Sequence, residues 1–314
     1  GYGDKIFYLT AKTITRTVAE EAFSILKGKG LSYKTLTITS KEKMCLMDEV
    51  ECNPEKCPYA KGHFDRVNDA VYELLTEQDT YQREVLLEQA EKWQVCPFEM
   101  CLDTSTWVDA VICDYNYVFD PNVYLKRFFG DGVKGDYLFL IDEAHNLVDR
   151  GRNMYSAVLC KEDFLEVKKV VKEHSRKLER ILEKCNKVLL EYKRECQDEY
   201  RVMENIGTLA LQLMNLLGEM ENFLEREQEE KVRSAVLEFS FEVRHFLNMY
   251  DLLDENYVIY TYHGAEGRFY LTLFCVNPKV NLQECLNKGR GTVFFSATLL
   301  PMGYYRSLFS TRED

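Results

Sequence analysis

The sequence predicts an α/β protein in which a single parallel sheet is interrupted twice. Three observations predict it. Strand and helix patterns alternate at the start of the chain, strand patterns return after residue 108, and a long helical region follows residue 150. Because alternating strands and helices are typical of a parallel sheet, we interpret the two regions that lack this alternation as insertions.

The first forty residues have a β-α-β pattern. Lys5–Leu9 and Thr35–Thr39 predict strands, and Thr15–Lys27 predicts a helix between them. Gly28 follows this helix at the position where glycine commonly ends one. We therefore assign residues 1–40 to the sheet domain.

Residues 41–107 interrupt this alternation of strands and helices. They are rich in cysteine and charge, and they contain two helical patterns, Val67–Leu75 and Val85–Trp93. We interpret them as a small inserted domain. Residues 108–150 return to the sheet, with strands expected at Asp109–Cys113 and Tyr137–Ile141.

Residues 151–255 predict an all-helical insertion. Apolar residues keep the spacing of one helix face over Phe164–Tyr192, of a second helix over Leu209–Leu224 and of a third over Val232–Leu253. A solvated coiled coil is the alternative. Residues 256–314 are assigned to the sheet domain again, with an expected hairpin of Tyr257–Tyr262 and Phe269–Val276 and a last strand at Thr292–Phe295.

Composition limits the classes of function. The chain has 314 residues and a net charge of −12, which argues against a surface built for broad nucleic-acid adhesion. A single strand can still follow a narrow basic groove on an acidic protein. No apolar run is long enough for a membrane span, and the first residues lack the features of a signal peptide. We therefore expect a cytoplasmic protein.

An acidic motif follows the strand predicted at Tyr137–Ile141. Asp142 and Glu143 would lie at the carboxyl end of that strand, the edge where open α/β sheets bind ligands. Nucleotide hydrolysis needs one carboxylate to hold Mg²⁺ and another to orient or deprotonate the attacking water. Asp142 suits the first role and Glu143 the second, and His145 is a candidate sensor of the γ-phosphate.

An Asp-Glu pair after a strand is also a common start of a helix, so the motif alone is weak evidence. Ser296-Ala297-Thr298 also follows an apolar strand and supplies two hydroxyl groups. We expect Ser296 and Thr298 to hydrogen-bond the acidic motif. Two motifs in matching contexts favour a nucleotide hydrolase over a helix cap.

The sequence contains no Gly-x-x-x-x-Gly-Lys-Ser/Thr loop, whose backbone would cradle phosphates. The segment Gly28–Thr35 has Tyr33 where the second glycine belongs and leads into a strand instead of a helix. Gly130–Gly135 also lacks the pattern. We therefore expect a fragment that lacks its phosphate loop.

Four cysteines form the second candidate site. The spacing is Cys45-x6-Cys52-x4-Cys57-x38-Cys96. Structural zinc sites commonly use shorter paired spacings, whereas a Cys-Pro step, present at Cys57 and Cys96, is found at iron–sulfur ligands. The residues alone leave three possibilities: an iron–sulfur cluster, a zinc site, or unligated thiols. Cys101 competes with Cys96 for the fourth place, and we prefer Cys96 because Pro97-Phe98 follows it.

These motifs resemble an iron–sulfur superfamily 2 DNA helicase of the XPD/DinG type. The resemblance covers nearly the whole chain and rests on the order of five motifs: Leu9-Thr10-Ala11-Lys12-Thr13, the four cysteines, Asp114-Tyr115-Asn116-Tyr117, Asp142-Glu143-Ala144-His145 and Ser296-Ala297-Thr298. It implies that residues 1–40, 108–150 and 256–314 form part of a RecA-like motor domain. It also implies an iron–sulfur domain over 41–107 and a helical arch over 151–255.

The resemblance also implies cofactors, partners and site residues. The cysteines would hold a [4Fe-4S] cluster, and the longer protein would use Mg²⁺ and ATP to move 5′ to 3′ on single-stranded or forked DNA as a monomer. Asp142, Glu143 and His145, with Ser296 and Thr298, would serve hydrolysis. Tyr115 and Asn116 would lie near DNA, and Thr10, Lys12 and Thr13 would lie near DNA phosphates or the motor core.

Some features depart from the family pattern. The Cys52-x4-Cys57 spacing is wider than in some XPD members and suggests a bacterial branch. The missing phosphate loop and second motor domain predict that this chain alone does not hydrolyse ATP. Lys61, His63 and Arg66 are candidates for a DNA contact, although a solvated helix start is the favoured interpretation. A helicase-linked nuclease and a metal-stabilised binding module without motor activity remain alternatives.

Overall fold

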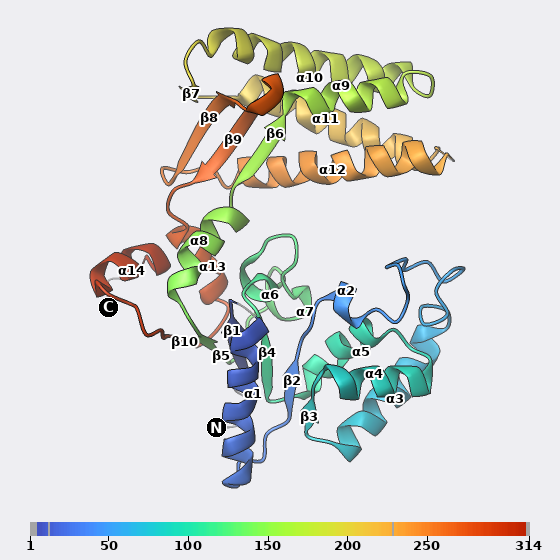
Figure 1. The fold of residues 1–314 in the computed structure, drawn as a ribbon, viewed down its shortest axis with the longest axis vertical. Coiled ribbons are helices and arrows are strands. Elements are labelled where there is room, and N and C mark those ends of the chain that lie inside the picture. Colours follow the sequence, from blue (N-terminus) through green and yellow to red (C-terminus); the bar gives the residue numbers. More distant parts are fainter. Residues whose placement is uncertain (1–4, 12, 228, 312–314) are drawn as a thin grey trace. The chain divides into compact units, whose positions relative to one another are not determined.

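The computed structural model describes residues 5–11, 13–227 and 229–311 (Figure 1). Its packing divides the chain into two compact units. The first comprises Gly1–Val148 and Lys279–Asp314, and the second comprises Asp149–Pro278. The first unit contains a parallel sheet with helices, so the predicted α/β fold class is confirmed.

Six parallel strands form the sheet of the first unit. Their order is β10-β5-β1-β4-β2-β3, with every neighbouring pair parallel. Apolar and β-branched runs account for five of them, as the sequence predicts. The bounds are β1 (Lys5–Thr10), β2 (Thr35–Thr37), β3 (Thr80–Tyr81), β4 (Ala110–Asp114), β5 (Tyr137–Ile141) and β10 (Gly291–Phe294).

The register of the central strands determines where the motifs lie. Leu9 of β1 is paired with Cys113 of β4 on one side and with Ile141 of β5 on the other. The three strands therefore end together, and the residues that follow them meet at one edge of the sheet. This is the edge at which parallel sheets bind ligands.

Helices and aromatic side chains cover the two faces of this sheet. Helix α1 (Thr13–Gly28) packs Ala19 and Phe23 against Ala110 and Ile112 of β4. Phe7 forms edge-to-face contacts with Phe128, Phe129 and Tyr137, with ring centroids 4.9–5.3 Å apart. The remaining helices of this part of the unit are α6 (Asn116–Phe119), α7 (Lys126–Phe129), α13 (Lys279–Leu286) and α14 (Met302–Phe309).

The first insertion is mostly helical. The two predicted helical patterns correspond to α3 (His63–Glu77) and α4 (Arg83–Trp93). Two further helices, α2 (Lys41–Met44) and α5 (Pro97–Thr104), flank them, and a 3-10 turn follows at Ser105–Trp107. Residues 45–62, all of which the structure describes, form turns and bends without a helix or strand. Three of the four candidate cysteines lie in this segment.

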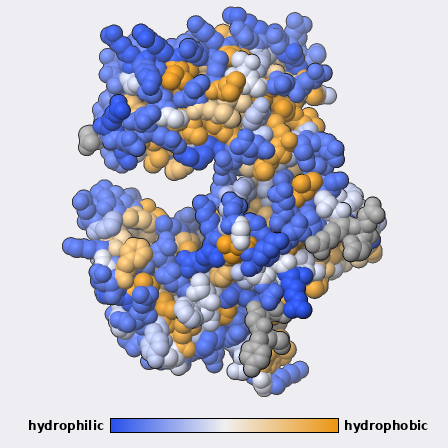
Figure 2. Space-filling model, turned by 180° about the vertical axis from the view of Figure 1, so that it is seen from behind, coloured by the Kyte–Doolittle hydropathy of each residue, from blue (hydrophilic) through white to orange (hydrophobic). Residues whose placement is uncertain are grey.

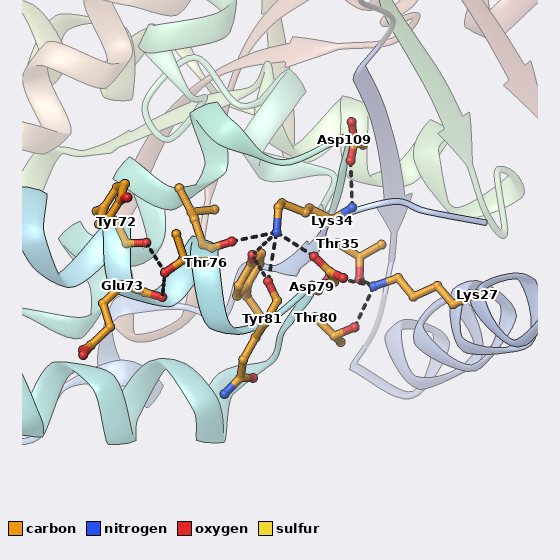
Figure 3. A network of polar contacts seen from close by, with 12 residues as sticks. Lys27, Lys34, Thr35, Tyr72, Glu73, Thr76, Asp79, Thr80, Tyr81 and Asp109 are labelled. Atoms are coloured by element: carbon orange, nitrogen blue, oxygen red, sulfur yellow. Dashed lines mark hydrogen bonds and ion pairs between the residues drawn. The ribbon is translucent and has the colours of Figure 1, made fainter. Parts of the chain in front are cut away.

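A polar network joins the insertion to the edge of the sheet (Figure 3). The Lys34 ammonium group donates to the carbonyl of Leu75 at 2.8 Å and to the carboxylate of Asp79 at 2.6 Å. The Lys27 ammonium group donates to the Thr35 hydroxyl at 2.9 Å and to the Thr80 hydroxyl at 2.6 Å. Strand β3 comes from the insertion and pairs with β2, so the insertion extends the sheet that it interrupts.

The second unit combines four long helices with an antiparallel sheet. The helices are α9 (Lys161–Val171), α10 (Arg176–Glu195), α11 (Gly207–Leu224) and α12 (Glu230–Asp251). The strand order is β6-β9-β8-β7, with bounds β6 (Ala157–Cys160), β7 (Tyr200–Met203), β8 (Tyr257–His263) and β9 (Phe269–Cys275). Helix α8 (His145–Met154) connects β5 to this unit along the chain.

Two sequence predictions about this region were wrong. Residues 151–255 are not all helical, because β6 and β7 lie among the helices. Residues 256–278 do not join the parallel sheet, because β8 and β9 pair with β7 and β6. The hairpin itself was predicted correctly, but the strand pattern of a hairpin does not reveal which sheet it enters.

The helix predicted over Phe164–Tyr192 is broken into α9 and α10. The break has a local cause at Ser175, whose side-chain oxygen accepts a hydrogen bond from the backbone N–H of Leu178 at 3.2 Å. Such an N-cap starts a new helix even where the apolar spacing continues.

The described surface is mixed in character. On the face shown in Figure 2, hydrophilic residues surround separate apolar patches. Among the described residues, no helix is both long enough and apolar enough to cross a membrane.

Candidate functional site

The acidic motif occupies the turn between β5 and α8. The backbone N–H of Asp142 donates to the carbonyl of Leu9 at 2.9 Å, which continues the pairing of β5 with β1 by one residue. Glu143 has a φ of 49°, in the left-handed region that non-glycine residues seldom adopt. The chain therefore turns sharply and places both carboxylates at the ligand-binding edge.

Two tyrosines hold this turn in place. The hydroxyl of the buried Tyr115 donates to the backbone carbonyl of Asp142 and, at 3.1 Å, to that of Glu143. The Tyr8 hydroxyl donates to Asp142 Oδ2 at 3.2 Å. Burial raises the pKa of Asp142, although the bond from Tyr8 opposes this shift. Burial, together with the Asp142 carboxylate, also raises the pKa of Tyr8.

The two hydroxyls of Ser296 and Thr298 meet the acidic motif, as the sequence predicts. Ser296 Oγ donates to Glu143 Oε2 at 2.9 Å and lies 2.8 Å from His145 Nδ1. Thr298 Oγ1 lies 3.2 Å from the same histidine nitrogen, and His145 Nδ1 lies 3.3 Å from Glu143 Oε2. Two segments far apart in the chain thus form one hydrogen-bonded group.

The four predicted cysteines line one cavity of about 360 Å³ in the first insertion. Cys57 is buried, Cys45 and Cys96 are partly buried, and Cys52 is exposed. Among the described residues, no three His, Cys, Asp or Glu side chains are grouped closely enough to hold one metal ion. Four thiols around a shared cavity suit a polynuclear cluster, whose iron atoms are distributed over several thiolates.

The structure distinguishes Cys96 from Cys101. Cys96 lines the cavity and immediately precedes α5, whereas Cys101 is wholly buried and does not line it. Burial raises the pKa of Cys96, but the backbone N–H groups of Phe98 and Glu99 oppose this shift. Burial raises the pKa of Cys101 to about 12, as expected for a thiol in the protein core.

A larger cavity of about 700 Å³ adjoins the cysteine cavity, and Lys41 and Phe98 line both. Four basic and two acidic side chains face it, together with aromatic and amide groups. We call it the basic cavity. Its charged lining residues are Arg16, Lys41, Lys126, Arg127, Glu42 and Asp114.

The sequence did not single out this cavity, because its residues come from several segments. Arg16 Nε is buried and has no hydrogen-bond partner in the part of the chain that the structure describes. Arg127 pairs with Asp103 at 3.0 Å. The ammonium group of Lys41 lies 5.9 Å from the ring centre of Phe98, and hydrogen bonding to the Cys52 sulfur raises the pKa of Lys41. The cavity therefore combines positive charge with aromatic rings.

The predicted DNA contacts have different outcomes. Thr10 and Tyr115 are both 0% exposed, so neither side chain lies on the described surface, and their contact with DNA stays a prediction. Tyr115 holds the acidic turn. Asn116 lines the basic cavity. Lys12 lies outside the described residues, and the structure does not describe the side chain of Thr13.

Of the three candidates after Cys57, Lys61 is exposed, as a solvated helix start predicts, but His63 and Arg66 make contacts within the insertion. His63 is only 4% exposed, and its Nδ1 accepts a hydrogen bond from the backbone N–H of Cys96 at 3.2 Å. Burial lowers the pKa of His63. Arg66 donates to the carbonyl of Trp93 at 2.9 Å and to that of Lys61 at 2.8 Å. Both side chains therefore serve packing within the insertion.

Residues 10–164 match the DEAD_2 family model. This segment includes the four cysteines and the acidic motif. A stretch of 88 residues is 33% identical to the Fanconi anemia group J protein homolog of Gallus gallus, and it covers 27% of this chain and 7% of that protein.

Two solved structures share the fold. "Truncated XPD" has a TM-score of 0.59 at 20% identity, and the match covers 98% of this chain and 85% of that chain. "XPD_Helicase" has a TM-score of 0.53 at 17% identity, and the match covers 98% of this chain and 52% of that chain. The chain thus spans about half of the longer structure and a small part of the curated relative. These findings support the resemblance to XPD/DinG-type superfamily 2 helicases.

Proposed function

We propose that this chain is part of an ATP-dependent DNA helicase of the XPD/DinG type, and that it carries a [4Fe-4S] cluster and binds single-stranded DNA. The observation that carries the proposal is the contact of Glu143 with Ser296 and His145, because it joins the two motifs expected of a motor. The family match over residues 10–164 supports it. Movement 5′ to 3′, action as a cytoplasmic monomer and origin in a bacterial branch belong to the same proposal.

The acidic turn suits nucleotide hydrolysis. Asp142 would hold Mg²⁺, which when bound offsets the charge of the phosphates. Glu143 would orient the attacking water and accept its proton. The bonds of Ser296 and Thr298 around His145 would link the state of this site to β10 and the segment that follows it.

We propose nucleotide hydrolysis for a longer protein and not for this chain alone, because the sequence contains no phosphate-loop motif. Isothermal titration with ATP and Mg²⁺ tests this step. We expect no measurable binding to the chain, and stoichiometric binding would contradict the proposal.

The cysteine cavity would hold the cluster through Cys45, Cys52, Cys57 and Cys96. Since these thiols fit the donor set of a [4Fe-4S] cluster, the cluster would stabilise a segment that has no backbone ladder of its own. The role proposed for the cluster is structural. It would fix the wall that separates the cysteine cavity from the basic cavity.

The basic cavity would contact the DNA strand. Positive side chains neutralise phosphates, and aromatic rings offer surfaces on which bases stack without sequence preference. Lys126, Arg16 and Asn116 are the residues we assign to this contact. The overall net charge of −12 is compatible with this role, because basic side chains outnumber acidic ones four to two in the lining of this cavity.

Fluorescence anisotropy with a labelled oligothymidylate tests the assignment. We expect Lys126→Ala to weaken binding about 3- to 10-fold at low salt and to reduce the salt slope by about one. The control is Lys231→Ala, an exposed lysine of α12, which should leave binding unchanged. Equal binding by both variants would contradict the assignment, and no binding by the unmodified chain would contradict the proposed contact with DNA.

A further inference from the structure

His63 is a buried histidine beside the candidate cluster ligands. It is the first residue of α3 and follows Gly62, whose φ of 68° lies in the left-handed region. His63 lines the same cavity as the four cysteines, yet only 4% of it is exposed to solvent. The prediction of a DNA contact or a solvated helix start does not account for this position.

The hydrogen bond to Cys96 determines the tautomer of the ring. Because Nδ1 accepts the backbone N–H of Cys96 at 3.2 Å, Nδ1 carries no proton. A neutral imidazole then carries its proton on Nε2, which is a donor. The same bond argues against His63 as a metal ligand, since a ligand nitrogen at Nε2 would have to be free of its proton as well.

The remaining donor has no protein partner. Nε2 of His63 is buried and makes no hydrogen bond to any described residue. A buried donor without an acceptor is costly and rare in folded proteins. An acceptor that is not a protein group would remove this cost. The cavity that His63 lines is also where the four cysteines would hold the proposed iron–sulfur cluster.

We propose that His63 Nε2–H donates a hydrogen bond to a sulfur of the cluster, either a bridging sulfide or a cysteine thiolate. The inference rests on the proposed cluster. His63 would then act in two directions, since Nδ1 positions the backbone of Cys96 while Nε2–H contacts the cluster. Hydrogen bonds to cluster sulfurs favour the more reduced state, so His63 would raise the reduction potential.

Two variants separate the two functions of the ring. His63→Asn retains a short side chain whose oxygen can accept the Cys96 N–H, but it lacks a donor at the position of Nε2. His63→Gln carries an amide donor that reaches that position. We expect His63→Asn to contain as much iron and sulfide as the unmodified protein but to have a more negative reduction potential. His63→Gln should restore most of the difference.

Spectroscopy of the unmodified protein provides a measurement that does not depend on the folding of the variants. In the dithionite-reduced protein, electron–nuclear double resonance in H₂O and D₂O should show an exchangeable proton coupled to the cluster. Labelling histidine with ¹⁵N should reveal a coupled nitrogen, and both signals should be absent from His63→Asn.

The possible outcomes test the His63 hydrogen bond separately from the proposed cluster on which it rests. A loaded cluster with the same potential and the same proton coupling in His63→Asn would overturn the hydrogen bond alone. The absence of the coupled ¹⁵N in the loaded, unmodified protein would do the same. Unmodified protein without iron and sulfide would overturn both the cluster and the hydrogen bond.

Discussion

The acidic turn and the cysteine cavity lie in the same unit but are built in different ways. In the acidic turn, the Tyr115 hydroxyl donates to the backbone and the Ser296 hydroxyl donates to Glu143. The cysteine cavity is bounded by residues 45–62, which contain no helix or strand, and by the start of α5. The acidic turn is organised by hydrogen bonds between segments far apart in the chain, whereas residues 45–62 are organised mainly by short-range turns, such as the bond from the Cys57 N–H to the Asn53 carbonyl at 2.8 Å.

This difference predicts how each site responds to a substitution or to the loss of a bound group. A site held by protein groups should lose stability in proportion to the bonds removed, and the loss should extend to the sheet. A site held by its thiols should lose its order when the bound group is lost, while the sheet remains folded. The following predictions test the contrast, beginning with the largest effect.

The largest effect is expected at Cys96. Cys96→Ala should lose most of the iron and expose residues 45–62 to proteolysis, because the variant lacks one of the four thiolates that would hold the cluster. Cys101→Ala is the matched control and should keep its iron while losing about 1 kcal/mol of stability from the core. Iron content and limited proteolysis measure both effects. Equal loss of iron in the two variants would show that the ligand assignment is wrong.

The next largest effect is expected at Tyr115. Tyr115→Phe removes the donor to two partly buried backbone carbonyls, so the first unit should lose about 1–3 kcal/mol of unfolding free energy. Urea denaturation followed by circular dichroism measures this loss, and the iron content should not change. Tyr72→Phe alters a side chain that is 72% exposed and should have little effect. If iron fell together with stability in Tyr115→Phe, the two sites would not be independent.

A smaller effect concerns the insertion at low pH. Glu73 of α3 accepts hydrogen bonds from Lys92 at 2.8 Å, Trp93 at 2.6 Å and Gln89 at 3.0 Å, all on α4. These partners, Lys92 first, lower the pKa of Glu73 to about 2. Because the folded pKa is depressed, the stabilisation is present above about pH 4.5 and is lost as the pH falls toward 2.

Trp93 fluorescence in a Trp107→Phe background measures this transition. Glu73→Gln should weaken the acid dependence of the Trp93 signal, whereas Glu77→Gln, on the same helix, should leave it intact. An unchanged acid transition in Glu73→Gln would exclude this bond network as its source.

The smallest effect is expected at Asp142. Burial raises its folded pKa above 3.8, so the folded state binds more protons and the contribution to stability falls as the pH rises through the raised pKa. Asp142→Asn should therefore be slightly more stable than the unmodified protein at pH 7 and show a weaker dependence on pH. Urea unfolding at pH 4 to 8 measures both. A less stable Asp142→Asn at pH 7 would contradict this picture of the acidic turn.

Local sequence patterns predicted the elements of this fold well. Apolar runs identified β1, β4, β5 and β10. The position of each motif after an apolar strand predicted the hydrogen bond between Ser296 and the acidic motif, which the structure contains at Glu143. Patterns failed where the structure depends on partners distant in the chain. The β8–β9 hairpin has the same pattern whichever sheet it enters, and the break before α10 depends on one cap at Ser175.

The positions of the candidate site residues also depend on contacts between segments distant in the chain. The sequence favoured Cys96 over Cys101 because Pro97 follows it, and the fold adds the physical reason: Cys96 lines the cavity and Cys101 does not. The position of His63 depends on the backbone of Cys96, 33 residues away, so no local pattern indicates it. Tyr115 was assigned to DNA because the motif was recognised without knowledge of its burial.

We propose that the four cysteines hold an iron–sulfur cluster in the first insertion. The most direct test is a determination of iron, acid-labile sulfide and zinc in protein purified without oxygen. We expect brown protein with about four irons and about four sulfides per chain, as a [4Fe-4S] cluster requires. Stoichiometric zinc without sulfide would contradict it.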